Sequence, residues 1–149
     1  MINSAGTAEL YPDQWGEGYS STVGGYLKSL NGNCGNGYSG DYVDPTTRPD
    51  KCSYAYNDET CDESCIVTEG IYWSLTSYIG AQYYGGSRAP GEWLLLTPDS
   101  SMTPLSEYST WGTMQDRAPD LFKLLGDRSK SYGKWLPTKV PDGSYGKTP

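Results

Sequence analysis

The chain contains no histidine among its 149 residues. Histidine is the usual general base near neutral pH, the commonest zinc ligand and a member of the Ser-His-Asp triad. Its absence from this chain excludes triad hydrolysis and any zinc site that needs an imidazole. An enzyme built from these residues would have to work with carboxylates, tyrosine or lysine.

Long apolar runs are also missing, since no stretch approaches the roughly 18 consecutive apolar residues of a membrane-spanning helix. The first 15 residues have neither the basic region nor the apolar stretch of a signal peptide. An exported protein would therefore have lost that signal or carry it outside this chain. Phenylalanine occurs once, against 14 tyrosines. Tyrosine combines apolar area with a polar tip, so it suits interfaces and half-buried loops better than a dry core.

Charge is distributed unevenly along the chain. Residues 1–65 contain ten acids and three bases, whereas residues 66–149 contain eight of each, so the first segment carries the whole net charge of −7. An acidic protein is a poor partner for nucleic acid, because phosphate binding needs lysine and arginine. It is compatible with calcium or with a basic surface on another subunit. Basic residues recur at short intervals late in the chain, at Lys123, Arg128, Lys130 and Lys134.

The segment 60–82 predicts a central helix. Thr60 and Glu63 have the spacing of a capping box, which places the start of the helix there. At 100° per residue the large apolar residues fall on one broad face, and the opposite face is apolar or small. We therefore expect a helix that is buried nearly all round, with an element packed closely against its interior glycines, Gly70 and Gly80.

Glu69 does not fit this helix, because it lies beyond the first turn. A buried carboxylate needs a partner or a function. The ordinary interpretation is an ion pair with an arginine or a solvent-exposed position. The functional alternative is a glycan hydrolase in which Glu69 is the acid and Glu92 or Asp99 is the second carboxylate.

The four cysteines, Cys34, Cys52, Cys61 and Cys65, predict two disulfides. Cys61 and Cys65 would run parallel along one helix face, so we expect each of them to pair with Cys34 or Cys52. The rival interpretation, a four-thiolate zinc site, lacks the paired C-x-x-C spacing. Disulfides indicate an oxidising, extracellular setting.

Turn-forming residues fill the segment 31–59, which contains two Asn-Gly pairs, Pro45 and Pro49. A loop of this length in a compact domain is usually functional or held by cross-links. Its carboxylates also suggest a structural calcium site, with solvated turns as the ordinary interpretation. The proposed calcium ligands are Asp41, Asp44, Asp50 and Asp58.

Shorter elements follow the central helix. Residues 92–96 predict a short helix, with a buried strand as the alternative, and Pro104 to Glu107 predict the start of another. The segment 118–127 is a clearer helix, with a proline at its first position and a glycine at its end. The tail from Trp135 to Pro149 is rich in proline and predicts an extended strip.

Together these patterns predict one domain, 1–149, that is mainly helical with long irregular loops, two disulfides and little strand. Residues 1–59 would be loop-rich and disulfide-tied, 60–126 the helical core and 127–149 an extended tail.

The expected function is a secreted, non-catalytic structural or adhesive module that assembles with copies of itself or binds extracellular matrix. The alternatives are the glycan hydrolase and a carbohydrate-binding module. The latter would bind sugars through exposed aromatic residues: Trp15, Tyr38, Tyr42, Tyr54 and Tyr56.

Overall fold

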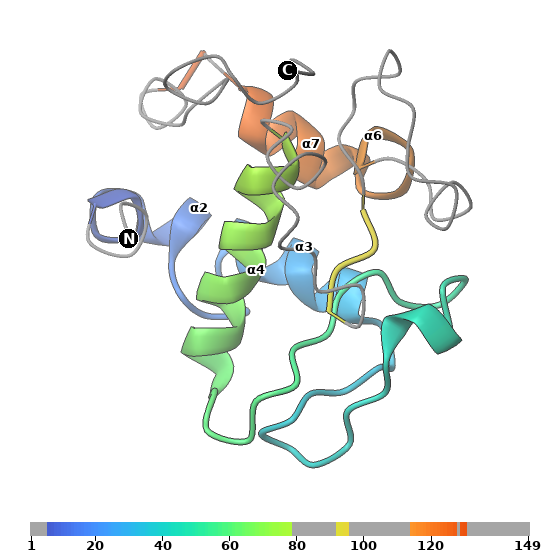
Figure 1. Cartoon of the computed structure of the whole chain (residues 1–149). Helices are drawn as coiled ribbons and strands as arrows, with labels where there is room; N and C mark the ends of the chain where they lie inside the picture. Colours follow the sequence, from blue (N-terminus) through green and yellow to red (C-terminus); the bar gives the residue numbers. More distant parts are fainter. Residues whose placement is uncertain (1–5, 79–91, 96–113, 128, 131–149) are drawn as a thin grey trace, which may run out of the picture. The chain divides into compact units, whose positions relative to one another are not determined.

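The computed structural model describes residues 6–78, 92–95, 114–127 and 129–130 (Figure 1). Its helices, in chain order, are α1 (Ala8–Leu10), α2 (Pro12–Trp15), α3 (Thr22–Asn31), the 3-10 helix η2 (Pro45–Thr47), α4 (Glu63–Tyr78), α6 (Met114–Arg117) and α7 (Pro119–Gly126). Within this part of the chain, β-pairing is limited to an antiparallel bridge between Tyr54 and Trp93. The prediction of a small, mainly helical, disulfide-stabilised fold with little strand is confirmed.

Contacts within the chain divide it into two compact units, which we describe separately. Unit 1 is Met1–Tyr72 with Ala89–Leu94, and unit 2 is Trp73–Arg88 with Leu95–Pro149. Unit 1 therefore contains α1, α2, α3, η2 and most of α4, and unit 2 contains the end of α4 together with α6 and α7. In the residues described, no helix is long and apolar enough to cross a membrane.

Helix α4 begins at Glu63 because Asp62 caps it. The Asp62 carboxylate accepts a hydrogen bond of 3.1 Å from the Cys65 amide. The predicted capping box of Thr60 and Glu63 is wrong, because the amide and hydroxyl of Thr60 both donate to the Asp58 carboxylate at 2.7 Å. Asp58 and Asp62 both accept hydrogen bonds from residues that follow them, and the helix begins after Asp62, the later of the two.

The predicted helix over 60–82 is thus confirmed from Glu63 to Tyr78, and residues 79–82 lie outside the described part. Its burial is less complete than predicted, because Tyr72 is 45% exposed and Glu69 is half-buried. The side of the helix that is buried carries Ile66, Val67, Gly70, Ile71, Trp73, Ser74 and Ser77.

Gly70 allows α3 to approach α4 closely, as the sequence predicted for an interior glycine. A Cβ atom at Gly70 would lie 2.8 Å from both terminal methyl carbons of Leu27 and 3.0 Å from a ring carbon of Tyr54. Real Cβ atoms almost never approach a neighbour at the first of these distances. Glycine is therefore required here by packing, and this offsets its low helix propensity. Gly80, the second predicted position, lies outside the described residues.

Tyr54 connects three segments of unit 1. Its hydroxyl donates to the Ile66 carbonyl in α4 at 2.5 Å. At the end of α3, its amide donates to the Leu30 carbonyl at 3.3 Å, and its carbonyl accepts from the Asn31 side chain at 3.1 Å. Its ring meets the Trp93 ring edge-on, with a centroid distance of 5.7 Å. This one residue, through its side chain and its backbone, therefore holds both helices and the extended segment together.

The segment 92–95 is extended, although the sequence favoured a short helix there. The Ala55 amide donates to the Glu92 carbonyl at 2.9 Å, and the Leu94 amide donates to the Ser53 carbonyl at 3.0 Å. The helix prediction is wrong because consecutive apolar residues carry no helical period. The buried strand considered as the alternative describes this segment better.

Helix α3 lies in the region 1–59 that was predicted to be loop-rich. Ser21 caps it, since its hydroxyl accepts from the Gly24 amide at 3.0 Å. A Cβ atom at Gly24 would lie 2.0 Å from the Gly18 carbonyl oxygen, so the close approach of this chain segment requires glycine. Gly24 and Gly25 together lower the helix propensity of the sequence, which is why it left this segment open between a short strand and a helical turn.

The disulfides are Cys34–Cys52, with Cα atoms 6.1 Å apart, and Cys61–Cys65, with Cα atoms 5.1 Å apart. The presence of two disulfides was predicted correctly, but the predicted pairing was wrong. That pairing assumed that Cys61 and Cys65 both lie on a regular helix. Because α4 begins at Glu63, Cys61 lies in the turn before it, where its side chain can reach Cys65. The loop 31–59 is therefore closed by its own bridge.

Unit 2 contains the helix predicted over 118–127, which forms α7. Its buried residues are Leu121, Leu124 and Leu125. The ring of Phe122 lies 5.4 Å from that of Tyr78, centroid to centroid. A Cβ atom at Gly126 would lie 3.0 Å from the Tyr78 hydroxyl, so a glycine fits there. The short helix predicted near Pro104 and the extended tail lie outside the described residues.

We expect Gly70→Ala to destabilise the protein by about 1–3 kcal/mol, because the added methyl group overpacks the contact with Leu27. Gly25→Ala is the matched control. It lies on the exposed side of α3, where a Cβ atom would have 3.8 Å of clearance, and it should stabilise the protein by about 0.5–1 kcal/mol. Urea unfolding of both variants measures the difference. A Gly70→Ala variant as stable as the Gly25→Ala variant would contradict this packing.

Candidate functional site

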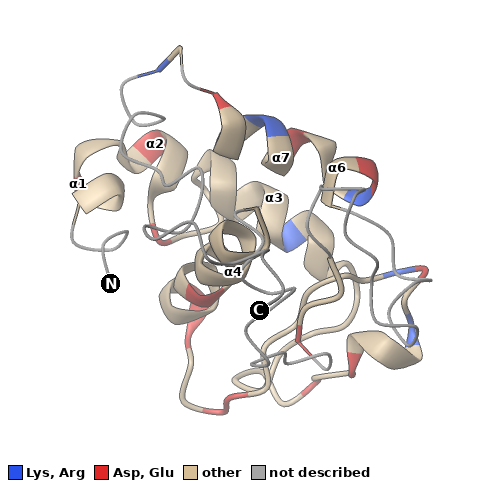
Figure 2. Ribbon diagram, turned by 45° about the horizontal axis from the view of Figure 1, so that its top comes forward, with Lys and Arg blue, Asp and Glu red and all other residues tan. Residues whose placement is uncertain are grey.

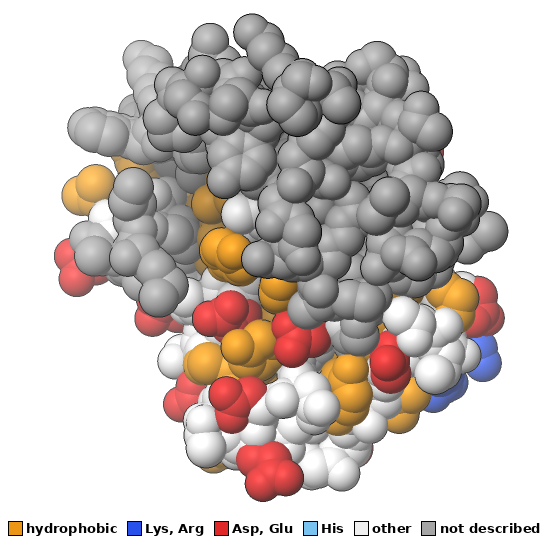
Figure 3. Space-filling view, in the orientation of Figure 1, with side chains coloured by type: hydrophobic (Ala, Val, Ile, Leu, Met, Phe, Trp, Pro, Cys, Tyr) orange, Lys and Arg blue, Asp and Glu red, His pale blue; other side chains and the backbone are white. Residues whose placement is uncertain are grey.

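Acidic residues dominate unit 1 (Figure 2). Residues 6–72 and 92–94 contain twelve aspartates and glutamates against three bases, Lys28, Arg48 and Lys51. Figure 3 shows acidic side chains spread over the visible face of the described residues. The ion pair among the described residues, Lys123–Asp120 at 3.8 Å, lies in unit 2. In the described part of unit 1, no ion pair neutralises this charge.

Several of these acids stabilise turns through hydrogen bonds. The Asp41 carboxylate accepts hydrogen bonds from the Ser39 hydroxyl and from the Asn36 amide, the latter at 3.1 Å. Both bonds lower the pKa of Asp41, and the bond from Ser39 has the larger effect. The Asp44 carboxylate caps η2 by accepting from the Thr46 amide at 2.8 Å. These carboxylates have a structural use that does not require a ligand.

The four aspartates proposed for calcium are not gathered into one site. No group of three or more carboxylate or cysteine side chains in the described residues is placed to hold a metal ion. Asp50 is exposed, and Asp58 accepts both hydrogen bonds of Thr60. The calcium site stays a prediction, because the described residues do not bring together a set of side chains that could bind the ion.

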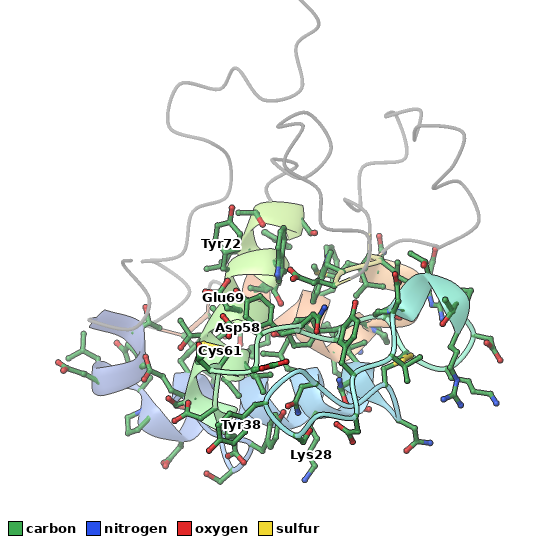
Figure 4. The ribbon with its side chains drawn as sticks, turned by 60° about the horizontal axis from the view of Figure 1, so that its bottom comes forward. Lys28, Tyr38, Asp58, Cys61, Glu69 and Tyr72 are labelled. Atoms are coloured by element: carbon green, nitrogen blue, oxygen red, sulfur yellow. A yellow bond between two sulfur atoms is a disulfide. The ribbon has the colours of Figure 1, made fainter. Side chains whose placement is uncertain are left out.

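The charges of a different group of carboxylates, from three segments of unit 1, act on one another. Asp58 lies in the turn before α4 and Glu69 lies on α4 (Figure 4), and Glu92 begins the extended segment. Glu69 and Glu92 are half-buried. Burial, and then the charge of Asp58, raises the pKa of Glu69; burial, and then the charges of Glu69 and Asp58, raises the pKa of Glu92.

Asp58 behaves in the opposite way. Its hydrogen bonds from the Thr60 hydroxyl and amide lower its pKa. The group therefore combines one carboxylate held in the ionised form with two that take up a proton more readily than a free glutamate does. Environments that separate the pKa values of neighbouring acids are common at functional sites.

The charges of this carboxylate group also act on two tyrosines of unit 1. Burial raises the pKa of Tyr56, with the charges of Glu69, Glu92 and Asp58 as further causes. Burial, together with the charges of Asp44 and Glu92, raises the pKa of Tyr42 to about 12. Both phenols therefore keep their protons at neutral pH and can donate hydrogen bonds.

The aromatic residues predicted to bind a ligand divide into two sets. Trp15 and Tyr54 are core residues, 0% and 1% exposed, so they offer no surface for stacking on a sugar. Tyr42 and Tyr56 are half-buried, and Tyr38 is 60% exposed. The two core residues are therefore a correction to the predicted set, because a sequence does not distinguish an aromatic loop anchor from a binding platform.

The two-carboxylate hypothesis stays a prediction. The charge of Glu69 contributes to the raised pKa of Glu92, whereas Asp99 lies outside the described residues. The arginine partner that the ordinary interpretation assigned to Glu69 is not found among the described residues. Asp58 was missed as a neighbour of Glu69, because no sequence spacing signals a contact made by a loop that folds back.

No protein-family model, curated protein or solved structure matched this chain.

We expect Glu69→Gln and Glu92→Gln to make the free energy of unfolding less dependent on pH. A carboxyl whose folded pKa is raised stabilises the fold most below the ordinary glutamate pKa of about 4.3 and loses that stabilisation as pH rises through the folded value. The wild type should therefore lose stability from about pH 4 upward, and each variant should lose less.

Urea unfolding between pH 4 and pH 7.5 provides the measurement, with Glu9→Gln, an exposed residue of α1, as the control for a lost charge. If the Glu69 and Glu92 variants keep the wild-type pH dependence, the two carboxyl groups do not titrate as described.

Proposed function

We propose that this protein is a secreted, non-catalytic adhesive module that associates with copies of itself through opposite charges. The observation that carries the proposal is the acidic surface of unit 1, whose carboxylates form no ion pair among the described residues. A surface of one sign attracts a partner of the other sign and repels its own kind.

The sequence provides the opposite charge in its last segment. Residues 128–147 contain five bases and one acid. Contact between this segment and unit 1 of another copy joins two different surfaces. Such heterologous contacts repeat from copy to copy and build rings or filaments.

The disulfides support an extracellular setting for this assembly. Both bridges persist in oxidising compartments, and the four cysteines are all paired. An adhesive module outside the cell needs to keep its fold without chaperones, and cross-links stabilise small domains for that purpose.

Light scattering on the oxidised protein tests the self-association. At about 20 mM salt we expect a mass that rises with protein concentration above 16.3 kDa, and at about 500 mM salt a return toward the monomer, because salt screens contacts between exposed charges. Negative-stain images of the low-salt sample should contain rings or filaments. A monomer at all concentrations in low salt would contradict the proposal.

A second function is favoured by the charges of Glu69 and Glu92, which act on each other's surroundings. A carboxyl with a raised pKa near a second carboxylate, with Tyr56 as a hydrogen-bond donor, has the groups that are used to bind or hydrolyse a glycan. In hydrolysis the protonated carboxyl gives its proton to the leaving oxygen, and the other carboxylate activates water or attacks the sugar. In simple binding, the same groups hold sugar hydroxyls.

Incubation with neutral oligosaccharides and a reducing-end assay tests this second function. If the protein is a hydrolase, Glu69→Gln should lower turnover at least hundredfold while the melting temperature stays the same or rises. Glu9→Gln, on α1, should keep full turnover. Wild-type protein that neither cleaves nor binds any oligosaccharide of the panel rejects the glycan site and leaves the self-association untouched.

A further inference from the structure

Tyr38 is an exposed aromatic residue on a tightly built loop. It is 60% exposed. The Asn36 side chain accepts a hydrogen bond from the Ser39 amide at 2.9 Å. Gly35 before Tyr38 and Gly40 after it adopt positive φ angles of 58° and 73°. The Cys34–Cys52 disulfide closes the chain around this loop. A tyrosine held on such a loop loses little conformational freedom when it binds, which is the property of a binding anchor.

The loop places Tyr38 beside the carboxylate group. The Gly37 amide donates to the Tyr56 carbonyl at 2.8 Å, and a Cβ atom at Gly37 would lie 2.5 Å from the Asp58 amide nitrogen. The charge of Asp58 in turn acts on Glu69.

On α4 the next residue along this side is Tyr72, three positions after Glu69 and 45% exposed. In the view of Figure 4, Tyr72, Glu69, Asp58 and Tyr38 come in this order, with Cys61 between Asp58 and Tyr38. We call these four residues the tyrosine–carboxylate strip.

The chemistry of the strip suits a cation. The face of a tyrosine ring attracts an ammonium or guanidinium group, and a neighbouring carboxylate adds a charged hydrogen bond. Unit 1 contains an example of the first contact, because the ammonium of Lys28 lies 5.2 Å from the centre of the Tyr19 ring. The strip combines two such rings with two carboxylates.

We propose that the strip binds the basic segment 128–147 of a second copy of this chain. The inference rests on the self-association proposed above and assigns its two contacting surfaces. The segment carries lysine or arginine at five of its twenty positions, and the strip has two carboxylates with a tyrosine ring beyond each of them. Lysine and arginine side chains place their charges against the carboxylates and their methylene stems against the rings.

Two variants that complement each other test the contact in the full chain. The strip variant carries Tyr38→Ala and Glu69→Gln. The tail variant carries Lys134→Gln, Lys139→Gln and Lys147→Gln. In a head-to-tail contact each variant has lost a different half, so each alone should stay at 16.3 kDa in light scattering at low salt. A mixture of the two should form a complex of twice that mass, because the intact tail of one fits the intact strip of the other.

The control is Leu10→Ala, at a residue of α1 that is 66% exposed, which should assemble like the wild type. We expect the strip variant to weaken association at least tenfold. If the wild type assembles and the strip variant assembles equally well, the strip is not the contact although self-association stands. If the tail variant assembles normally, the segment 128–147 is not the occupant. If the wild type stays monomeric, both proposals fail.

Discussion

The contacts of Tyr54 hold unit 1 together. Its hydroxyl is bonded to the Ile66 carbonyl of α4, its backbone is bonded to the end of α3, and its ring packs on Trp93. A buried tyrosine hydroxyl without a partner costs about 1–3 kcal/mol, so this hydrogen bond fixes the position of the loop relative to the helix. The glycine at position 70 makes the arrangement possible, because a side chain there would displace both the Tyr54 ring and Leu27.

The carboxylate group is a consequence of that arrangement. Tyr56 and Asp58 follow Tyr54 along the loop. Glu92 directly precedes Trp93, whose ring contacts the Tyr54 ring. Glu69 lies one position before the glycine on α4. Once Tyr54 is in place, three acids from distant parts of the sequence are close enough to repel one another. The fold stabilises this cluster by burying apolar residues beneath it, since like charges brought together oppose folding.

The parts of the fold that were predicted correctly depend on local periodicity. The helices at 63–78 and 119–126 each have a regular spacing of large apolar residues, and that spacing is enough to identify them. The sequence left helix α3 undecided between a short strand and a helical turn, because Gly24 allows a close tertiary contact with the Gly18 carbonyl at the expense of local propensity. A glycine that is required by packing cannot be recognised from the sequence until the residue that packs against it is known.

The errors in the disulfide pairing and in the site have a similar origin. A shift of the helix start from Thr60 to Glu63 moves Cys61 off the helix and makes its bridge to Cys65 geometrically acceptable. Glu69 was recognised from sequence alone as an acid in an unusual position. Its neighbours Asp58 and Glu92 approach through a loop and an extended segment, and neither approach leaves a spacing pattern in the sequence.

The hydrogen bonds at the two Asn-Gly pairs also affect the chemical lifetime of the protein. Asparagine followed by glycine deamidates when the glycine amide nitrogen attacks the asparagine side chain. Here the Gly32 amide donates to two carbonyls in the last turn of α3, and the Gly37 amide donates to the Tyr56 carbonyl. The Asn31 side chain is itself held by two carbonyl acceptors. The fold therefore slows ageing at the two Asn-Gly bonds of the segment 31–59, and deamidated protein in an old sample would record how often that segment has opened.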